Sequence, residues 1–199
     1  GKLAILFSGT VTHEHDLALV ERAIERIIRE FPEHVEFLFW GNAPAKLKKL
    51  PQIKIVDAFM PNYKDYAARL KTLPVDLALV PLEVVPFNQA KSPVKWLEYS
   101  ACKIPGIYTN IEAYNQVIEH GKTGWLVTNN AEAWYEAIKK LILDDSLRRS
   151  IAENAHQAVL SRHLLKQNTH LWTQAYERVL ALPAKKISDP AAQVSIVIP

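Results

Sequence analysis

The sequence predicts an α/β fold, a doubly wound, Rossmann-like parallel sheet with a helical extension at its C-terminal end. Two observations carry this prediction. Runs that are apolar throughout alternate with amphipathic stretches at helical spacing, which is typical of strands buried on both faces and helices packed over them. From residue 131 to about residue 182 the pattern is helical only. The chain has 199 residues, of which 49% are hydrophobic, so it can bury a sizeable core.

The predicted strands are short apolar runs bounded by turn-forming residues. The first ends at Ser8-Gly9-Thr10, the second at Gly41-Asn42-Ala43-Pro44, and the last follows the turn Gly121-Lys122-Thr123-Gly124. We expect strands, in order, at residues 3–7, 35–40, 53–59, 77–82, 106–109 and 124–127.

The predicted helices lie between these runs. Apolar residues recur at helical spacing from Asp16 to Glu30, and Pro61-Asn62 open a second helix that reaches Leu70. Another helix begins at Ser92, and the helical tail from residue 131 breaks near 144–146 and 162–163. Because ligands of such sheets bind outside the carboxyl ends of the strands, we expect the site in the loops that follow them.

The segment from Pro86 to Glu98 is the most informative stretch. Ser92 is a preferred N-cap residue and Pro93 suits the first turn of a helix, so free N–H groups there can face an anion. Lys91 and Lys95 add two positive charges. Glu98 lies too deep in the helix to help capping, and a ribose diol is one partner that would explain it.

Composition and charge exclude several classes of protein. The net charge of +3, from 24 basic and 21 acidic side chains, gives no argument for nucleic acid. Cys102 is the single cysteine, which excludes an internal disulfide and favours a reducing compartment, by default the cytoplasm. No apolar run is long enough to span a bilayer, although association with the cytoplasmic face of a membrane stays open. No Asp-x-Asp pair or other metal-ligand spacing occurs, so we expect no metal and no cofactor.

The C-terminal residues indicate a domain boundary. Residues 183–193 lose the helical periodicity and carry two prolines, which predicts a linker after a domain that covers residues 1–182. Residues 194–199, Val-Ser-Ile-Val-Ile-Pro, favour a strand again. We expect this strand to open a following domain that the sequence truncates.

The motifs and their order resemble the C-terminal, donor-binding domain of a group 1 GT-B glycosyltransferase, over residues 2 to 182. The resemblance rests on Phe7-Ser8-Gly9-Thr10, Gly41, Asp76 to Leu82, Phe87 to Glu98, and Glu119-His120-Gly121 to Leu126. It implies a nucleotide-sugar donor, and an acceptor domain on the N-terminal side as partner, so that this chain alone binds donor without turnover. The terminal strand is similar to the opening strand of family 2-type GT-A glycosyltransferases.

The resemblance also implies roles for individual residues. Glu98 would hold the ribose hydroxyls, and the helix start would face the diphosphate with the two lysines nearby. A set that includes His13 and Asn88 is similar to a subgroup found in large bacterial multidomain transferases of surface polysaccharide synthesis. The implied donor-binding residues are Gly9, Thr10, His13, Asn88, Lys91, Ser92, Pro93, Val94, Lys95 and Glu98, with Phe59, Pro61 and Tyr63 on the side of the base.

Departures from the common pattern keep other interpretations open. Position 90 is alanine where the common form has a glutamate that holds the sugar, and Thr10 and His15 stand where it has arginine and lysine. A degenerate GT-B half that acts as a scaffold between active modules is therefore the alternative. A GT-B epimerase and a flavodoxin-like or response-regulator module explain the pattern less well. Individually, Lys95 and Glu98 could also be an ordinary surface pair on a helix.

Overall fold

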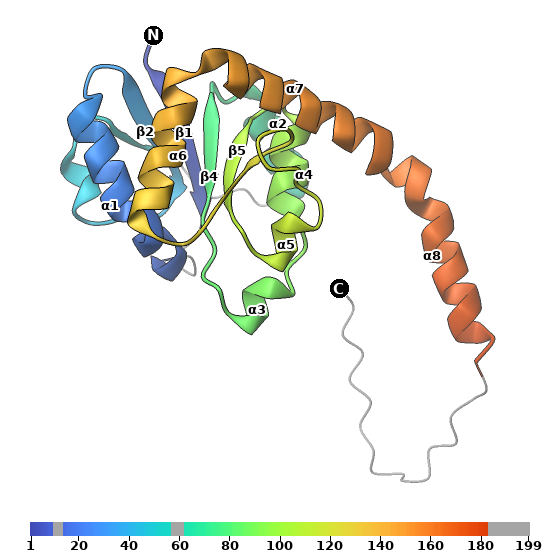
Figure 1. Ribbon diagram of the computed structural model, residues 1–199. Helices are drawn as coiled ribbons and strands as arrows, with labels where there is room; N and C mark the ends of the chain where they lie inside the picture. The colour runs from blue at the N-terminus through green and yellow to red at the C-terminus, as the bar shows by residue number, and fades with distance from the viewer. Residues whose placement is uncertain (10–13, 57–61, 183–199) are drawn as a thin grey trace. The chain divides into compact units, whose positions relative to one another are not determined.

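A computed structural model describes residues 1–9, 14–56 and 62–182, and its α/β architecture confirms the predicted fold class (Figure 1). Within these ranges six parallel strands form one sheet in the order β3-β2-β1-β4-β5-β6. The structure confirms the third predicted strand as far as Val56, and residues 57–59 of that prediction lie outside the described residues. The strands are β1 (Leu3–Gly9), β2 (Val35–Gly41), β3 (Ile53–Val56), β4 (Leu77–Val80), β5 (Gly106–Thr109) and β6 (Trp125–Val127).

Helices cover both faces of this sheet, as the apolar strands require. Figure 1 shows α1 and α6 over one face, where they pack on Ile5 and Phe7 of β1. Ala4 and Leu6 point to the opposite face and pack with residues of α2, α4, α5 and α7. The helices are α1 (Glu14–Glu30), α2 (Tyr63–Thr72), α3 (Pro86–Gln89), α4 (Val94–Ala101), α5 (Glu112–Asn115), α6 (Ala131–Leu143), α7 (Asp145–Arg162) and α8 (Leu165–Leu180), with a short 3-10 helix, η2 (Leu47–Lys49).

Side-chain caps begin several helices. Asn62 accepts a hydrogen bond from the Asp65 N–H at 3.0 Å at the start of α2, close to where the sequence predicts that helix to open. Asn130 caps α6, and Asp144 caps α7 by accepting from the Leu147 N–H at 2.9 Å. The predicted break near residue 144 is thus the boundary between two helices.

The prediction that Ser92 caps the helix before Glu98 is wrong. Helix α4 begins at Val94, its N-cap residue is Pro93, and no side chain caps it by a hydrogen bond. Pro93 has a ψ of 33°, outside the helical range, so it cannot serve as the first helical residue. Pro93 therefore takes the N-cap position itself, and the helix begins one residue later than predicted, at Val94.

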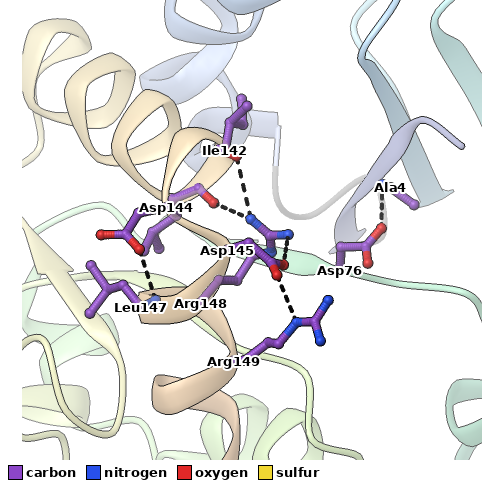
Figure 2. Close-up of polar contacts among 9 residues, drawn as sticks. Ala4, Asp76, Ile142, Asp144, Asp145, Leu147, Arg148 and Arg149 are labelled. Atoms are coloured by element: carbon purple, nitrogen blue, oxygen red, sulfur yellow. Dashed lines mark hydrogen bonds and ion pairs between the residues drawn. The ribbon is translucent and has the colours of Figure 1, made fainter.

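The junction of α6 and α7 is held by one arginine (Figure 2). The Arg148 guanidinium donates to the carbonyl oxygens of Leu141 at 2.6 Å and Ile142 at 3.4 Å, which belong to the last turn of α6. It also pairs with Asp145 at 2.6 Å. At the same end of the sheet the Asp76 carboxylate accepts from the Ala4 N–H at 2.9 Å and joins β4 to β1 (Figure 2).

The chain divides into two units, residues 1–163 and 164–199. In the second unit, α8 has no buried residue and exposes Trp172 and Tyr176, whose ring centroids are 6.5 Å apart. The predicted linker and terminal strand, residues 183–199, lie outside the described residues. Within the described ranges, no helix combines the length and the apolar character needed to cross a bilayer.

Candidate functional site

A pocket of about 210 Å³ lies at the carboxyl ends of β1 and β4. In this strand order β2 and β3 are added on one side of β1, whereas β4, β5 and β6 are added on the other side, so the strand order reverses between β1 and β4. Doubly wound folds bind their ligands in the crevice at this point. The walls come from the ends of both strands, from the loop after β4 and from the first turn of α4. The lining residues are Phe7, Ser8, Leu79, Val80, Pro81, Leu82, Lys91, Ser92, Val94, Lys95, Tyr99 and Tyr114.

Lys95 is the cation built into the wall of this pocket. Its Nζ donates to the Ser8 Oγ at 3.2 Å and lies 5.6 Å from the ring centroids of Tyr66 and Tyr99. Burial lowers the pKa of the Lys95 ammonium below its ordinary value, and the nearby Glu98 carboxylate partly opposes this shift. A half-buried ammonium with these few partners can bind an additional anionic oxygen.

Lys91 and Ser92 form the rim of the pocket. Lys91 is half-buried, and its Nζ lies 5.2 Å from the ring centroid of Phe87, a side chain that is 75% exposed. The first N–H groups of α4, which follow Ser92 and Pro93, have no acceptor within the helix. An anion at this rim would therefore meet backbone donors and two ammonium groups.

Glu98 lies next to the pocket and is not among its lining residues. The Tyr66 hydroxyl of α2 donates to Glu98 Oε2 at 2.9 Å, and the same hydroxyl oxygen is 3.5 Å from Lys95 Nζ. Burial, with a smaller effect of the nearby Glu98 carboxylate, raises the pKa of the Tyr63 phenol above its ordinary value. Lys95 and Glu98 are both half-buried and are connected through the Tyr66 hydroxyl, so they are not an ordinary surface pair.

The loop between β4 and α4 is held by side chains from several parts of the sheet edge. The Leu82 N–H donates to Thr109 Oγ1 at 2.8 Å, and Asn129 donates to the Leu82 carbonyl oxygen at 2.6 Å. The Glu83 N–H donates to the buried Asp16 carboxylate at 2.6 Å. These bonds fix the backbone that leads to Lys91 and Ser92.

The structure brings several predicted site residues together. Lys91, Ser92, Val94 and Lys95 line the pocket, Pro93 lies between them in the chain, and Glu98 is joined to Lys95 through Tyr66. Gly9 follows the lining residue Ser8 at the end of β1. Two other predicted residues do not line the pocket. Asn88 is buried, and its side chain donates to the Glu83 carbonyl oxygen at 2.9 Å. The side chain of Tyr63 is 65% exposed. Thr10, His13, Phe59 and Pro61 lie outside the residues that the structure describes.

The implied donor-binding residues leave out Ser8, Tyr66 and Tyr99, which surround the Lys95 ammonium, and Trp40, whose ring packs against that of Tyr66. Ser8 stands at the end of the first predicted strand, where the site was expected. Trp40, Tyr66 and Tyr99 carry no such signal, because an aromatic residue on a strand or helix is equally typical of the core. Among the described residues, no group of three or more His, Cys, Asp or Glu side chains could hold a metal ion. Independence from metal stays a prediction.

The strand order and the cationic pocket at the carboxyl edge define a Rossmann-like domain that could receive an anionic ligand there. Comparison with known protein families identifies the family of this domain. Residues 2–144 match the family model described as glycosyl transferases group 1. The chain belongs to this family.

Solved structures show the same fold. The C-terminal domain of the group 1 glycosyl transferase LpcC from Francisella tularensis superposes with a TM-score of 0.62 at 19% identity, covering 82% of this chain and 87% of that domain. A glycosyltransferase from Rickettsia africae gives 0.71 at 19% identity, covering 92% of this chain and 49% of the other. Anabaena HepE, solved with UDP-glucose, gives 0.69 at 15% identity, covering 89% of this chain and 49% of HepE. At these identities the likeness shows the GT-B half fold alone.

A curated relative is similar in sequence. An exopolysaccharide phosphotransferase of Streptomyces coelicolor is 26% identical over 170 residues, which are 80% of this chain. The chain spans only 18% of that relative's length.

Proposed function

We propose that this domain binds the nucleoside diphosphate part of a sugar donor at the pocket between β1 and β4, as the donor-binding half of a glycosyltransferase. The observation that carries the proposal is the placement of Lys91, Lys95 and the first turn of α4 around one pocket, with the Glu98 carboxylate joined to Lys95 through a single phenol. Membership in the group 1 family and the UDP-glucose complex of HepE support it.

The proposed contacts follow from the chemistry of glycosyl transfer. Breaking the bond between the sugar and the diphosphate leaves negative charge on the leaving phosphate oxygens. Lys95, Lys91 and the free N–H groups of α4 would stabilise that charge without a metal ion. Loss of one such donor costs about 3 kcal/mol of transition-state stabilisation, or roughly a hundredfold in rate. The Glu98 carboxylate would accept hydrogen bonds from the ribose hydroxyls, and the exposed Tyr63 ring would lie on the side of the base.

The wider role is also part of the proposal. The chain covers about half of the full-length glycosyltransferase structures but most of the isolated LpcC domain, as expected for one half of a transferase whose other half binds the acceptor. The name of the Streptomyces relative, an exopolysaccharide phosphotransferase, favours a role in bacterial surface polysaccharide synthesis. We propose that this role is carried out in the cytoplasm or at its membrane face, within a longer multidomain protein.

Calorimetric titration with UDP, GDP and dTDP tests the proposal. We expect one of them to bind, Lys95→Gln to weaken it by about a hundredfold and Lys91→Gln by less, because Lys91 lies at the rim. Lys140→Gln is the matched control, since Lys140 is an exposed lysine of α6 near Trp125 and outside the pocket. No binding of any of the three nucleotides would reject the proposal and favour the scaffold alternative. That alternative rests on Ala90 in place of the sugar-holding glutamate and on Thr10 and His15 in place of the basic residues of the first loop.

A further inference from the structure

One phenol connects the two charged side chains of the candidate site. The Tyr66 hydroxyl has one proton, which it donates to Glu98 Oε2 at 2.9 Å, and its oxygen accepts from Lys95 Nζ at 3.5 Å. Tyr66 comes from α2, whereas Lys95 and Glu98 lie on adjacent turns of α4. The contact therefore fixes these two side chains relative to each other from a second helix.

The ring of Tyr66 is itself held in place. It packs against the buried Trp40 at the end of β2, with ring centroids 4.9 Å apart and an interplanar angle of 33°. Burial, with smaller effects of Tyr99 and Glu98, raises the pKa of the Tyr66 phenol far above its ordinary value. The hydroxyl therefore stays protonated, and stays a donor to the carboxylate, over the whole physiological pH range.

Tyr63 approaches the same carboxylate from a different environment. Its ring centroid lies 5.9 Å from that of Tyr66, but its side chain is 65% exposed. A carboxylate offers about four acceptor positions, so it can keep the bond from Tyr66 and still accept two hydroxyl groups. Because its side chain is exposed, Tyr63 leaves this side of the carboxylate open to an incoming ligand.

We propose that Tyr66 is a positioning residue: it holds Glu98 through Oε2 so that the carboxylate accepts the two ribose hydroxyls of the nucleotide, whereas Lys95 keeps its shorter bond to Ser8 without it. The proposal rests on the function proposed above. It assigns to the packing of α2 on Trp40 a role in recognition of the ribose diol.

A cycle of ligands and variants tests the role of Tyr66. Affinities of UDP and GDP and of their 2′,3′-dideoxy forms are measured by calorimetry for the 199-residue chain and for Tyr66→Phe, which keeps the ring on Trp40. We expect Tyr66→Phe to weaken the ribonucleotide about tenfold and the dideoxy form less than about twofold. In a Glu98→Gln background Tyr66→Phe should cause little further loss, because the bond it removes acts through that carboxylate.

The control and the opposing outcomes are specific. Tyr135→Phe removes another phenol–carboxylate hydrogen bond, to Glu30 between α6 and α1, and should leave all affinities unchanged. Equal weakening of ribonucleotide and dideoxy forms, or no weakening of either, would overturn the positioning role while the proposed function stands. Binding of dTDP without either ribonucleotide would do the same. Failure of the unmodified chain to bind UDP, GDP and dTDP would reject the proposed function, and the role of Tyr66 with it.

Discussion

Replacing Arg148 by methionine should destabilise the domain far more than the same change at the next residue. Figure 2 shows Arg148 reaching the end of α6, while Arg149 extends from the following position of α7. The side chain of Arg148 is 11% exposed and that of Arg149 is 80% exposed, although both pair with Asp145. The comparison keeps the residue type, the helix and the charge change constant, so it isolates the role of the buried guanidinium.

The structure gives the size of the effect. The bond of 2.6 Å from Arg148 to the Leu141 carbonyl oxygen involves a charged donor and is worth about 1.5–3 kcal/mol. A positive charge at the end of α6 adds about 0.3–1 kcal/mol. The pair with Asp145 adds little, because Asp145 is half exposed and keeps Arg149 as a partner at 2.8 Å. The free energy of unfolding should therefore fall by about 2–4 kcal/mol in Arg148→Met and by less than about 0.5 kcal/mol in Arg149→Met.

Urea unfolding followed by circular dichroism at a helical wavelength measures both changes. The denaturant slope should be the same in the two variants, so that the shift of the midpoint reports stability alone. Equal losses in Arg148→Met and Arg149→Met, or a loss below about 1 kcal/mol in the first, would show that the capping of α6 by Arg148 does not stabilise the domain as argued.

Three further predictions concern the backbone, the loop and the charged site. Lys103, after α4, has a φ of 57°, a conformation that glycine adopts more readily than alanine, and its side chain pairs with Glu153. Both Lys103→Gly and Lys103→Ala lose that pair, so the free energy of unfolding should be about 1 kcal/mol higher in Lys103→Gly than in Lys103→Ala, and the opposite order would refute the backbone argument. Thr109→Val leaves the Leu82 N–H without its acceptor and should lower the free energy of unfolding by about 1–3 kcal/mol in the same assay, so an unchanged midpoint would contradict it. Because burial lowers the pKa of Lys95, nucleotide affinity should fall as the pH rises through that lowered pKa, and calorimetry on Lys95→Arg should show no such fall.

Most of the fold could be predicted from local patterns. The strands at the centre of the sheet, β1, β4 and β5, are buried at almost every position and mostly apolar, so each left a run of its own in the sequence. The edge strand β3 is only partly buried and carries Lys54, but Ile53, Ile55 and Val56 still form a recognisable run. The helix boundaries near residues 62 and 144 were predictable because Asn62 and Asp144 cap helices with their own side chains. The short helices α3 and α5 were not predicted, since four residues are too few to show helical periodicity.

The start of α4 shows where local rules give the wrong residue. A serine before a proline is common at a helix N-terminus, and this pattern predicted that Ser92 caps the helix. In the structure Pro93 occupies the cap position and the helix begins at Val94, because the backbone at Pro93 is still outside the helical range. The error is one of boundary, and Lys95 and Glu98 keep their places on the helix.

Only part of the candidate site could be predicted, because its parts are distant in sequence. Lys91, Lys95 and Glu98 lie within one short segment, so their pattern is visible in the chain itself. The contacts that orient them come from Ser8 and Tyr66, 87 and 29 residues away from Lys95. Such contacts depend on strand order and helix packing, which the apolar pattern of single segments does not encode.

The environment of Lys95 bears on the choice between a donor site and an inert scaffold. A scaffold gains nothing from a half-buried ammonium whose pKa is lowered by burial, because desolvation of that charge opposes folding. Among the described residues this ammonium donates to two oxygen atoms, those of Ser8 and Tyr66. An apolar side chain of similar length would fit the same wall at less cost. A charge kept at the expense of stability, beside a pocket at the carboxyl edge of a parallel sheet, is what a site for an anionic ligand requires. The packing around Lys95 therefore favours a working donor site over a degenerate one.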